Sequence, residues 1–235
     1  YCGLFYNASL DHSIKQFFFP EDESKHITKV LRKKEGDMLH ITNGKGYLYK
    51  AKIIEANPKK CKAQLVSEEK VLPRLHTLHL AVAPTKMNDR FEWFLEKATE
   101  IGINQITPIL CERSERKTIK PERLQRVLQS AMKQSLQTYL PRLNPMVSLE
   151  KFITEAAGEL KFIAHCAKDE KVELKRRLQA DKDVIVLIGP EGDFTENEID
   201  MAYSKGYLPV SLGRNRLRTE TAAIYACTVI SMLNN

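Results

Sequence analysis

The pattern of apolar and polar positions changes near residue 72. Before that point, short β-rich runs predict strands over residues 38–56 and 61–69, and one helix over residues 20–33. The Asn43-Gly44 pair interrupts the first run and indicates a hairpin, because both residue types tolerate positive φ. Pro20 and acidic residues begin the helix and basic residues end it, which matches the helix dipole. Several short strands with one helix predict a small β-barrel.

After residue 75, apolar runs alternate with amphipathic stretches. The runs predict strands over residues 76–84, 103–110, 160–166, 183–188 and 207–213. The amphipathic stretches predict helices over residues 88–102, 121–137, 170–178, 195–206 and 219–233. Such alternation is typical of a mostly parallel sheet covered by helices on both faces. We therefore expect two domains, a β-barrel over residues 1–72 and an α/β domain over residues 73–235.

The charge of the chain is mildly basic. Among 235 residues, 37 Lys and Arg outnumber 30 Asp and Glu, which gives a net charge of +7. Residues 1–72 carry 13 Lys and Arg against 9 Asp and Glu, so the first domain is the denser positive surface. This distribution fits a surface that binds a polyanion.

Cysteine usage and hydropathy bear on the cellular compartment. The five cysteines are scattered and form no C-x-x-C pair, which argues against a disulfide framework or a zinc site. No apolar run approaches the ~20 residues that span a bilayer, and the first residues lack the pattern of a signal peptide. We expect a protein of the reducing cytoplasm, with no membrane partner and no metal.

Unusual polar loops follow the predicted strand ends at residues 164–170, 189–194 and 212–222. Ligands of open α/β sheets bind at the carboxyl ends of the strands. Gly189 and Gly192 expose backbone, Pro190 stiffens the turn, and Thr195 with Glu198 forms a capping-box pattern. This acidic turn is not a phosphate loop and suits a neutral or cationic ligand. The alternative is a strand-to-helix turn with good caps and no ligand.

The loop at residues 212–222 contains three alternating arginines, Arg214, Arg216 and Arg218. In an extended segment all three would project to one side, where their guanidinium groups suit phosphate or carboxylate. Thr219 is expected to cap the last helix, with Glu220 in its first turn. The alternative is a solvated basic turn before a capped helix.

Together, "IGPEGDFTENEI" and "SLGRNRLRTETAAIYA" resemble the motifs of the RsmE family of SPOUT-superfamily methyltransferases. The resemblance covers essentially the whole chain, including "HITKVLRKKEGDMLHITNGKG" and "KMNDRFEWFLEKATEIGINQITPILCERS". Members transfer a methyl group from S-adenosylmethionine to N3 of a uridine in 16S ribosomal RNA. One position departs from the family pattern, because Gln137 stands where members often have the arginine of Glu-Gln-Ser-x-Arg. An RNA contact by that arginine is therefore not carried over.

The resemblance implies a SPOUT-type, mostly parallel α/β sheet with a C-terminal trefoil knot, preceded by a PUA-like RNA-binding β-barrel. It also implies a homodimer packed through the knot, with each active site at the subunit interface. The family's substrate implies 16S ribosomal RNA as the partner, within the small ribosomal subunit.

The resemblance and the residue chemistry together give a set of candidate site residues. S-adenosylmethionine would be bound by His165, Ile188, Gly189, Pro190, Glu191, Gly192, Leu212, Gly213, Leu217, Thr219 and Thr221. His165 is alternatively a structural histidine with satisfied hydrogen bonds. RNA would be bound by Lys29, Arg32, Lys33, Lys34, Arg113, Arg214 and Arg216.

Two residues are expected to act on the uridine. Arg218 would stabilise the anion that forms when N3 loses its proton, and Glu220 would accept that proton. The alternative for Glu220 is that it only stabilises the helix N-terminus. Two other functions remain open: methylation of a different RNA nucleotide on the same scaffold, and a non-catalytic RNA-binding assembly factor.

Overall fold

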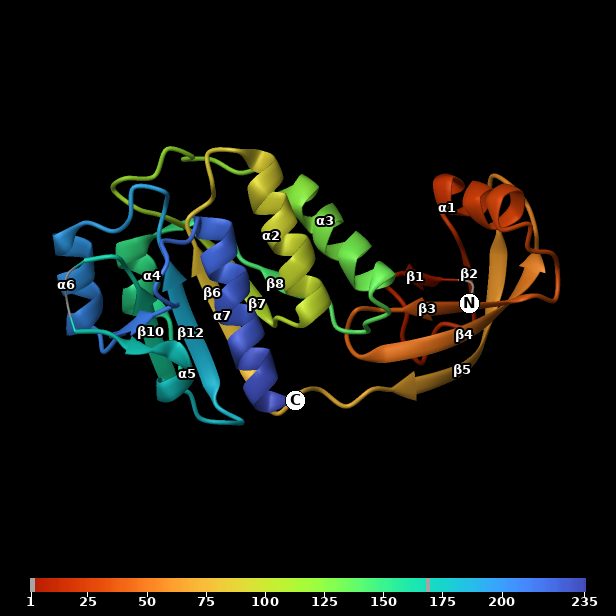
Figure 1. Ribbon diagram of the computed structural model, residues 1–235. Coiled ribbons are helices and arrows are strands. Elements are labelled where there is room, and N and C mark those ends of the chain that lie inside the picture. Colours follow the sequence, from red (N-terminus) through yellow and green to blue (C-terminus); the bar gives the residue numbers. More distant parts are fainter. Residues whose placement is uncertain (1–2, 168–169) are drawn as a thin grey trace. The chain divides into compact units, whose positions relative to one another are not determined.

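The computed structural model describes residues 3–167 and 170–235 (Figure 1). The chain divides into two compact units. The first consists of Tyr1–Pro73 with Met132–Leu140, and the second of Arg74–Ala131 with Pro141–Asn235. Helix α3 (Pro121–Gln134) therefore begins in the second unit and ends in the first. None of the helices in the described ranges is long and apolar enough to cross a membrane.

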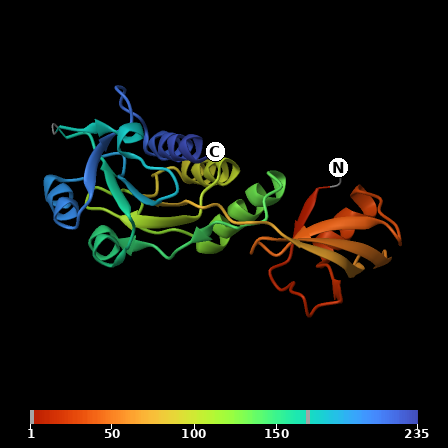
Figure 2. The ribbon, with the colours of Figure 1, turned by 90° about the horizontal axis from the view of Figure 1, so that it is seen from below.

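The first unit is built on a curled sheet, whose orange strands are visible in Figure 2. The strands Leu4–Tyr6 (β1) and Met38–Thr42 (β3) pair in parallel, and the other neighbours pair antiparallel. Ile27, Leu39, Ile41 and Tyr49 are almost completely buried in its core. The spatial order is β1 (Leu4–Tyr6), β3 (Met38–Thr42), β4 (Tyr47–Glu55), β5 (Lys62–Lys70) and β2 (Gln16–Phe18).

The hairpin predicted at Asn43-Gly44 is present, but its loop is longer than a two-residue turn. The last pair of the ladder is Thr42 with Leu48. Positive φ occurs at Gly44 (73°) and Gly46 (96°). The buried Asn43 side chain instead accepts the backbone N–H of Lys45 at 2.9 Å. Asn43 therefore stabilises this loop through its side chain.

The single helix predicted over residues 20–33 is shorter and changes its hydrogen-bonding pattern. Helix α1 spans Glu21–Lys25 and continues as the π-helix η1 over His26–Val30. The N–H of Leu31 donates to the carbonyl oxygen of His26 at 2.9 Å, an i to i−5 bond. Arg32 has φ 52°, which ends the helix. Apolar spacing cannot distinguish the two helix types over one turn.

The second unit contains the parallel sheet that the sequence predicts. Every strand pairing recorded for this sheet in the described chain is parallel. The two-residue strands β8, β9 and β11 were not predicted, because two residues show no periodicity. The order is β11 (Val172–Glu173), β13 (Leu208–Ser211), β10 (Leu160–Ala164), β12 (Asp183–Ile188), β6 (Thr77–Val82), β7 (Gln105–Leu110) and β8 (Arg142–Leu143), with β9 (Val147–Ser148) also beside β7.

Helices cover both faces of this sheet (Figure 2). Helices α2 (Asn88–Ile101) and α7 (Thr219–Asn234) pack together on one face, and α7 also contacts β6 and β12. Helices α4 (Leu149–Glu155) and α6 (Glu196–Ser204) cover the other face. Ala81, Ile185 and Leu187 pack beneath α4 and α6, while the alternate residues Leu80 and Val186 are completely buried on the opposite side.

Two predicted helices are wrong in extent. The helix predicted over residues 170–178 is reduced to α5 (Leu174–Arg177), because Val172–Glu173 pairs with β13 instead. Residues 168 and 169, in the loop predicted at 164–170, lie outside the described residues. Helix α3 ends at Gln134 rather than 137, since Leu136 has φ 59° and the N–H of Gln137 bonds to Met132. Helix α4 was not predicted.

The last segment of the chain recrosses the carboxyl ends of the central strands. Strand β13 lies on the far side of β10 from β12, whereas α7 packs on β12 and β6. Residues 212–218 therefore return across β10 and β12 before α7 begins. At the end of this crossing, the Thr219 hydroxyl donates to the carbonyl oxygen of Gly189 at 2.9 Å. A trefoil knot requires a crossing of this kind.

Candidate functional site

A cleft of about 830 Å³ lies at the carboxyl ends of β10, β12 and β13 in the second unit. This volume is in the range of cofactor and small-ligand sites. Three segments line it, residues 164–166, 188–193 and 210–220, together with Arg90, Arg113, Lys171 and Ala222. The sequence predicted loops at all three strand ends, and the fold brings them into one cleft.

The glycines of the 189–192 turn pack closely against other side chains of the protein. A Cβ on Gly189 would lie 3.0 Å from the Phe194 ring, and one on Gly192 would lie 3.2 Å from Cβ of Arg113. The Arg113 guanidinium also donates to the carbonyl oxygen of Gly192 at 2.9 Å. The interpretation that both glycines exist to admit a ligand is therefore incomplete, because their missing side chains make room for Phe194 and Arg113.

The two acidic residues of the turn hold it against neighbouring segments. Glu191 accepts the backbone N–H of Lys86 at 2.9 Å. Asp193, which has φ 67°, accepts the backbone N–H of Cys166 at 2.9 Å. The carboxylate of Glu191, which was expected to lie beside a cationic ligand, thus already accepts a backbone N–H.

His165 forms part of the cleft wall and is 6 % exposed. Its Nδ1 accepts the backbone N–H of Ala167 at 3.2 Å, which assigns the proton of the neutral ring to Nε2. The Nε2 atom lies 2.7 Å from the Tyr203 hydroxyl. Lys171 donates to the carbonyl oxygens of His165 and Ala167 at 2.7 and 2.8 Å. Both ring nitrogens therefore have partners within the protein.

The floor of the cleft is apolar. Ile188 and Val210 are buried, and Leu212 and Leu217 are half-buried beside them. Gly213 has φ 103°, and a Cβ there would meet open space, so backbone conformation alone accounts for the glycine. This floor can cover an aromatic ring system while the surrounding peptide groups bind its edge.

The three arginines of the last loop line the cleft, although their segment is not an extended strand. Residues 212–218 form an irregular turn, and Arg214, Arg216 and Arg218 are all exposed. The condition of an extended segment is therefore not met, because the chain bends at residues 214 and 215. Their common placement results from the curvature of the turn around the cleft mouth.

The start of α7 differs from the predicted cap. Arg218 is the N-cap and makes no side-chain capping bond, while Thr219 is the first helical residue. The predicted capping role of Thr219 is thus wrong, because its hydroxyl bonds to Gly189 across the knot region. Thr221 is exposed on α7 and is not among the residues that line the cleft.

Glu220 lies in the cleft wall and is 8 % exposed. One of its carboxylate oxygens is 4.0 Å from Nε of Arg90, in the first turn of α2. Sequence reasoning missed Arg90, because no local motif marks a residue that meets Glu220 only through the packing of α2 on α7. Arg90 thus lines the cleft together with Arg113, Arg214, Arg216 and Arg218.

The buried cysteines cannot serve as nucleophiles. Burial raises the pKa of the Cys61 and Cys111 thiols, and burial raises the pKa of Cys227 to about 12. These thiols are protonated at neutral pH and act as small apolar side chains. Within residues 3–167 and 170–235, no group of His, Cys, Asp and Glu has the arrangement of a metal site.

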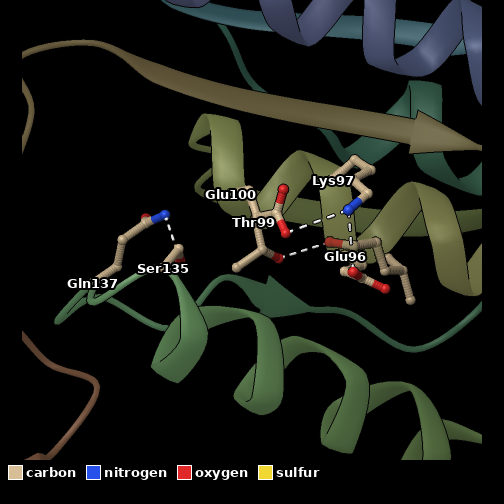
Figure 3. Close-up of polar contacts among 7 residues, drawn as sticks. Glu96, Lys97, Thr99, Glu100, Ser135 and Gln137 are labelled. Atoms are coloured by element: carbon tan, nitrogen blue, oxygen red, sulfur yellow. Dashed lines mark hydrogen bonds and ion pairs between the residues drawn. The ribbon is translucent and has the colours of Figure 1, made fainter. Parts of the chain in front are cut away.

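The basic residues predicted in the first unit lie on and after η1. Lys29, Arg32 and Lys34 are exposed, and Lys33 is half-buried. Gln137, which departs from the family pattern, also belongs to this unit, and its amide donates to the Ser135 hydroxyl at 3.0 Å (Figure 3).

Comparison with known proteins identifies the family. The profile of the RNA methyltransferase domain matches residues 73–231, and that of the RNA methyltransferase PUA domain matches residues 19–66. The ribosomal RNA small subunit methyltransferase E of Buchnera aphidicola is 31% identical over 234 residues, covering 95% of this chain and 90% of its own. The chain belongs to the ribosomal RNA small subunit methyltransferase E family. The member from Synechocystis is 30% identical, covering 88% of this chain and 70% of its own.

Solved structures agree with membership of this family. A probable rRNA-methyltransferase from Porphyromonas gingivalis has a TM-score of 0.93 and 38% identity, covering 99% of this chain and 98% of its own. A putative methyltransferase from Legionella pneumophila, solved with bound S-adenosylmethionine, has a TM-score of 0.87 and 30% identity, covering 98% of this chain and 97% of its own. The predicted fold class, a SPOUT-type α/β sheet preceded by a PUA-like β domain, is confirmed.

Proposed function

We propose that the protein methylates N3 of a specific uridine in 16S ribosomal RNA, with S-adenosylmethionine as the methyl donor. The observation that carries this proposal is the single cleft in which the glycine-rich turn, the apolar floor, the arginines and Glu220 meet. Family membership supports the same activity.

The residues of the cleft fit the methyl donor. The apolar floor of Ile188, Val210, Leu212 and Leu217 suits an adenine ring, and the backbone around Gly213 suits hydrogen bonds to its edge. The remaining candidates, His165, Gly189, Pro190, Glu191, Gly192 and Thr219, also line the cleft or fix its walls. Thr221 stays a weaker candidate, since it does not line the cleft. When bound, the donor supplies an electrophilic methyl group on a cationic sulfonium.

Arg218 and Glu220 are the proposed catalytic residues. Uridine N3 carries a proton with an acidity like that of tyrosine, near pKa ~10. The Arg218 guanidinium at the cleft mouth would stabilise the negative charge that develops on the uridine carbonyl oxygens. The Glu220 carboxylate would accept the N3 proton, and Arg90 would orient that carboxylate.

RNA would be bound by basic residues of both units. Arg214 and Arg216 at the cleft mouth would contact the phosphates around the target uridine. Lys29, Arg32, Lys33 and Lys34 would bind further RNA through the first unit. Arg113 remains a candidate, although its guanidinium already braces the 189–192 turn. We further propose a homodimer that acts without metal, in the cytoplasm, where ribosomal particles reside.

Primer extension on small ribosomal particles tests the function. Particles that lack the modification are incubated with the protein and S-adenosylmethionine, and a stop at a single uridine is expected. Arg218→Ala should abolish the stop while calorimetry with S-adenosylhomocysteine shows nearly unchanged binding. Arg218→Lys, which keeps the charge but loses the planar fork, should retain partial activity. A stop at another base would mean a different target specificity, and failure of the wild type to bind S-adenosylhomocysteine would favour the assembly factor.

A further inference from the structure

The outer face of the sheet in the first unit carries side chains that the proposed function does not use. In β4, Tyr49, Ala51 and Ile53 point into the core, so Lys50 and Lys52 point outward. Gln64 pairs with both Lys52 and Gln16, and Lys62 pairs with Phe18. Two rows therefore cross β4, β5 and β2: one contains Lys52, Gln64 and Gln16, and the other contains Glu55, Lys62 and Phe18. We call Gln16, Phe18, Lys50, Lys52, Lys60, Lys62 and Gln64 the Phe18 surface.

Phe18 is the aromatic residue of this surface. Its side chain is 44% exposed, although its neighbours Phe17 and Phe19 contribute to the core. The Nζ atoms of Lys60 and Lys62 lie 4.3 and 5.6 Å from the centre of its ring. Exposing a phenylalanine ring to solvent is unfavourable. The two ammonium groups beside the Phe18 ring make this surface unsuitable for binding an apolar partner.

The charge of the surface is positive near Phe18. Lys50, Lys52 and Lys60 are exposed and Lys62 is half-buried. The exposed Glu55 lies opposite Lys62 in the β4–β5 ladder. Towards its far end, β5 becomes acidic at Glu68 and Glu69. The positive potential is thus concentrated on the half of the sheet that carries the aromatic ring.

The loop that carries Lys60 is held by local hydrogen bonds. The Asn57 side chain accepts the backbone N–H groups of Lys59 and Lys60 at 2.8 and 3.3 Å. The N–H of Phe19 donates to the carbonyl oxygen of Cys61 at 2.8 Å, which ties the end of this loop to β2. The backbone beside Phe18 is therefore fixed, and only the lysine side chains have to rearrange when a ligand binds.

We propose that the Phe18 surface binds a single-stranded segment of RNA, with one base stacked on Phe18 and the adjacent phosphates bound by Lys60 and Lys62. Exposed aromatic rings among lysines on a sheet are the arrangement by which many proteins bind unpaired bases. The Gln16 and Gln64 amides can bond to base edges or to 2′-hydroxyl groups. The inference rests on the proposed function only in taking RNA as the ligand.

The lysines beside the ring do not prevent stacking. An exposed contact between an ammonium group and an aromatic ring is weaker than the stacking of a base on the same ring. A base would therefore displace the lysine ammonium groups from the ring, and the nearby phosphates would then attract them. The contacts seen without RNA keep the ring partly covered until RNA arrives.

Fluorescence anisotropy of the full chain with a fluorescein-labelled oligouridine of about a dozen nucleotides tests this surface. Phe18→Ala should weaken binding by roughly 5- to 150-fold, the range that corresponds to the loss of one stacked base. Phe18→Trp should bind at least as tightly as the wild type, while Phe18→Leu should resemble Phe18→Ala. Val66→Ala, which shortens an exposed apolar side chain on the neighbouring strand β5, is the matched control and should leave binding unchanged.

The salt dependence tests the lysines separately. The double variant Lys60→Gln with Lys62→Gln should reduce the slope of log affinity against log salt by up to about 1.4, since each contact to a single strand contributes about 0.7. Phe18→Ala should leave this slope almost unchanged. The pair Lys151→Gln with Lys205→Gln, two exposed lysines of the second unit that the proposed function does not use, provides the comparison for charge loss alone.

Several outcomes would overturn the inference. Equal oligouridine affinity of Phe18→Leu and the wild type would exclude stacking. A lower oligouridine affinity of Phe18→Trp would also exclude it, provided that circular dichroism shows a folded chain. A change of oligomeric state in Phe18→Ala by sedimentation, with unchanged RNA affinity, would identify the surface as a protein interface. The proposed methyl transfer has a separate readout, because S-adenosylhomocysteine binding is measured on the same variants and should not change.

Discussion

The hydrogen bond between Thr219 and Gly189 connects the start of α7 to the turn that follows β12. Replacing Thr219 by Val removes the hydroxyl and keeps the shape of the side chain, so that no cavity forms. The bond is 2.9 Å long and Thr219 is 5 % exposed. We expect Thr219→Val to destabilise the second unit and to weaken cofactor binding together, since one contact fixes both walls of the cleft.

The magnitude follows from the burial of this bond. A buried carbonyl group that loses its partner costs about 1–3 kcal/mol, because water cannot replace the missing donor. In a protein of this size, each 1 kcal/mol shifts the melting temperature by about 2–4 °C, which gives a decrease of about 2–12 °C. Affinity for S-adenosylhomocysteine should fall as well, since the Gly189 turn would sample other conformations.

Differential scanning calorimetry and titration calorimetry measure the two effects. Thr219→Ser keeps the hydroxyl and loses only a methyl group, so it should remain close to the wild type in both assays. A Thr219→Val protein that melts within about 1 °C of the wild type and binds S-adenosylhomocysteine equally well would refute the reasoning. The contact would then be incidental to the cleft.

Three further predictions concern the supports of the site and the core. Glu198→Gln should lower the free energy of unfolding by about 1–3 kcal/mol in urea titrations. The N–H groups of Thr195 and Glu112 bond to different carboxylate oxygens of Glu198, and one of these becomes an NH2 donor in glutamine. The exposed Glu196→Gln is the control. Gly213→Ala should lower the free energy of unfolding by about 1–3 kcal/mol through backbone strain at φ 103° alone. An unchanged melting temperature would contradict this. Burial lowers the pKa of His79 from 6.5 to about 4, so between these pH values the unfolded chain binds more protons than the folded one. The free energy of unfolding should therefore fall by roughly 3 kcal/mol as the pH drops from 6.5 to 4. His79→Gln should remove most of this pH dependence in thermal melts across that range.

Features that depend on neighbouring residues could be predicted from the sequence. The capping box of Thr195 and Glu198 is present with both of its hydrogen bonds, because a cap involves only four consecutive residues. The buried strands β6, β7, β10 and β12 lie close to their predicted positions, since each has a run of apolar residues that no exposed segment would carry. The parallel sheet then followed from the alternation of strands and helices.

Features that depend on distant pairs could not be predicted in the same way. Thr219 has the residue type of an N-cap, yet its hydroxyl bonds to Gly189, which approaches it only because the chain recrosses the sheet. Arg90 meets Glu220 through the packing of two helices that lie far apart in sequence. The change from α- to π-helix at His26 likewise depends on backbone hydrogen bonds that the apolar pattern does not indicate.

The charges of the cleft show why residue types alone were insufficient to assign its ligands. Glu191 and Asp193 made the 189–194 turn look acidic, but both carboxylates accept backbone N–H groups of neighbouring segments. Arg214, Arg216 and Arg218 instead remain exposed at the mouth. An internal hydrogen bond holds each acidic group on the protein, whereas the exposed guanidinium groups face approaching solutes. Exposed guanidinium groups beside apolar lining residues support the proposal that the cleft binds RNA and a nucleoside cofactor.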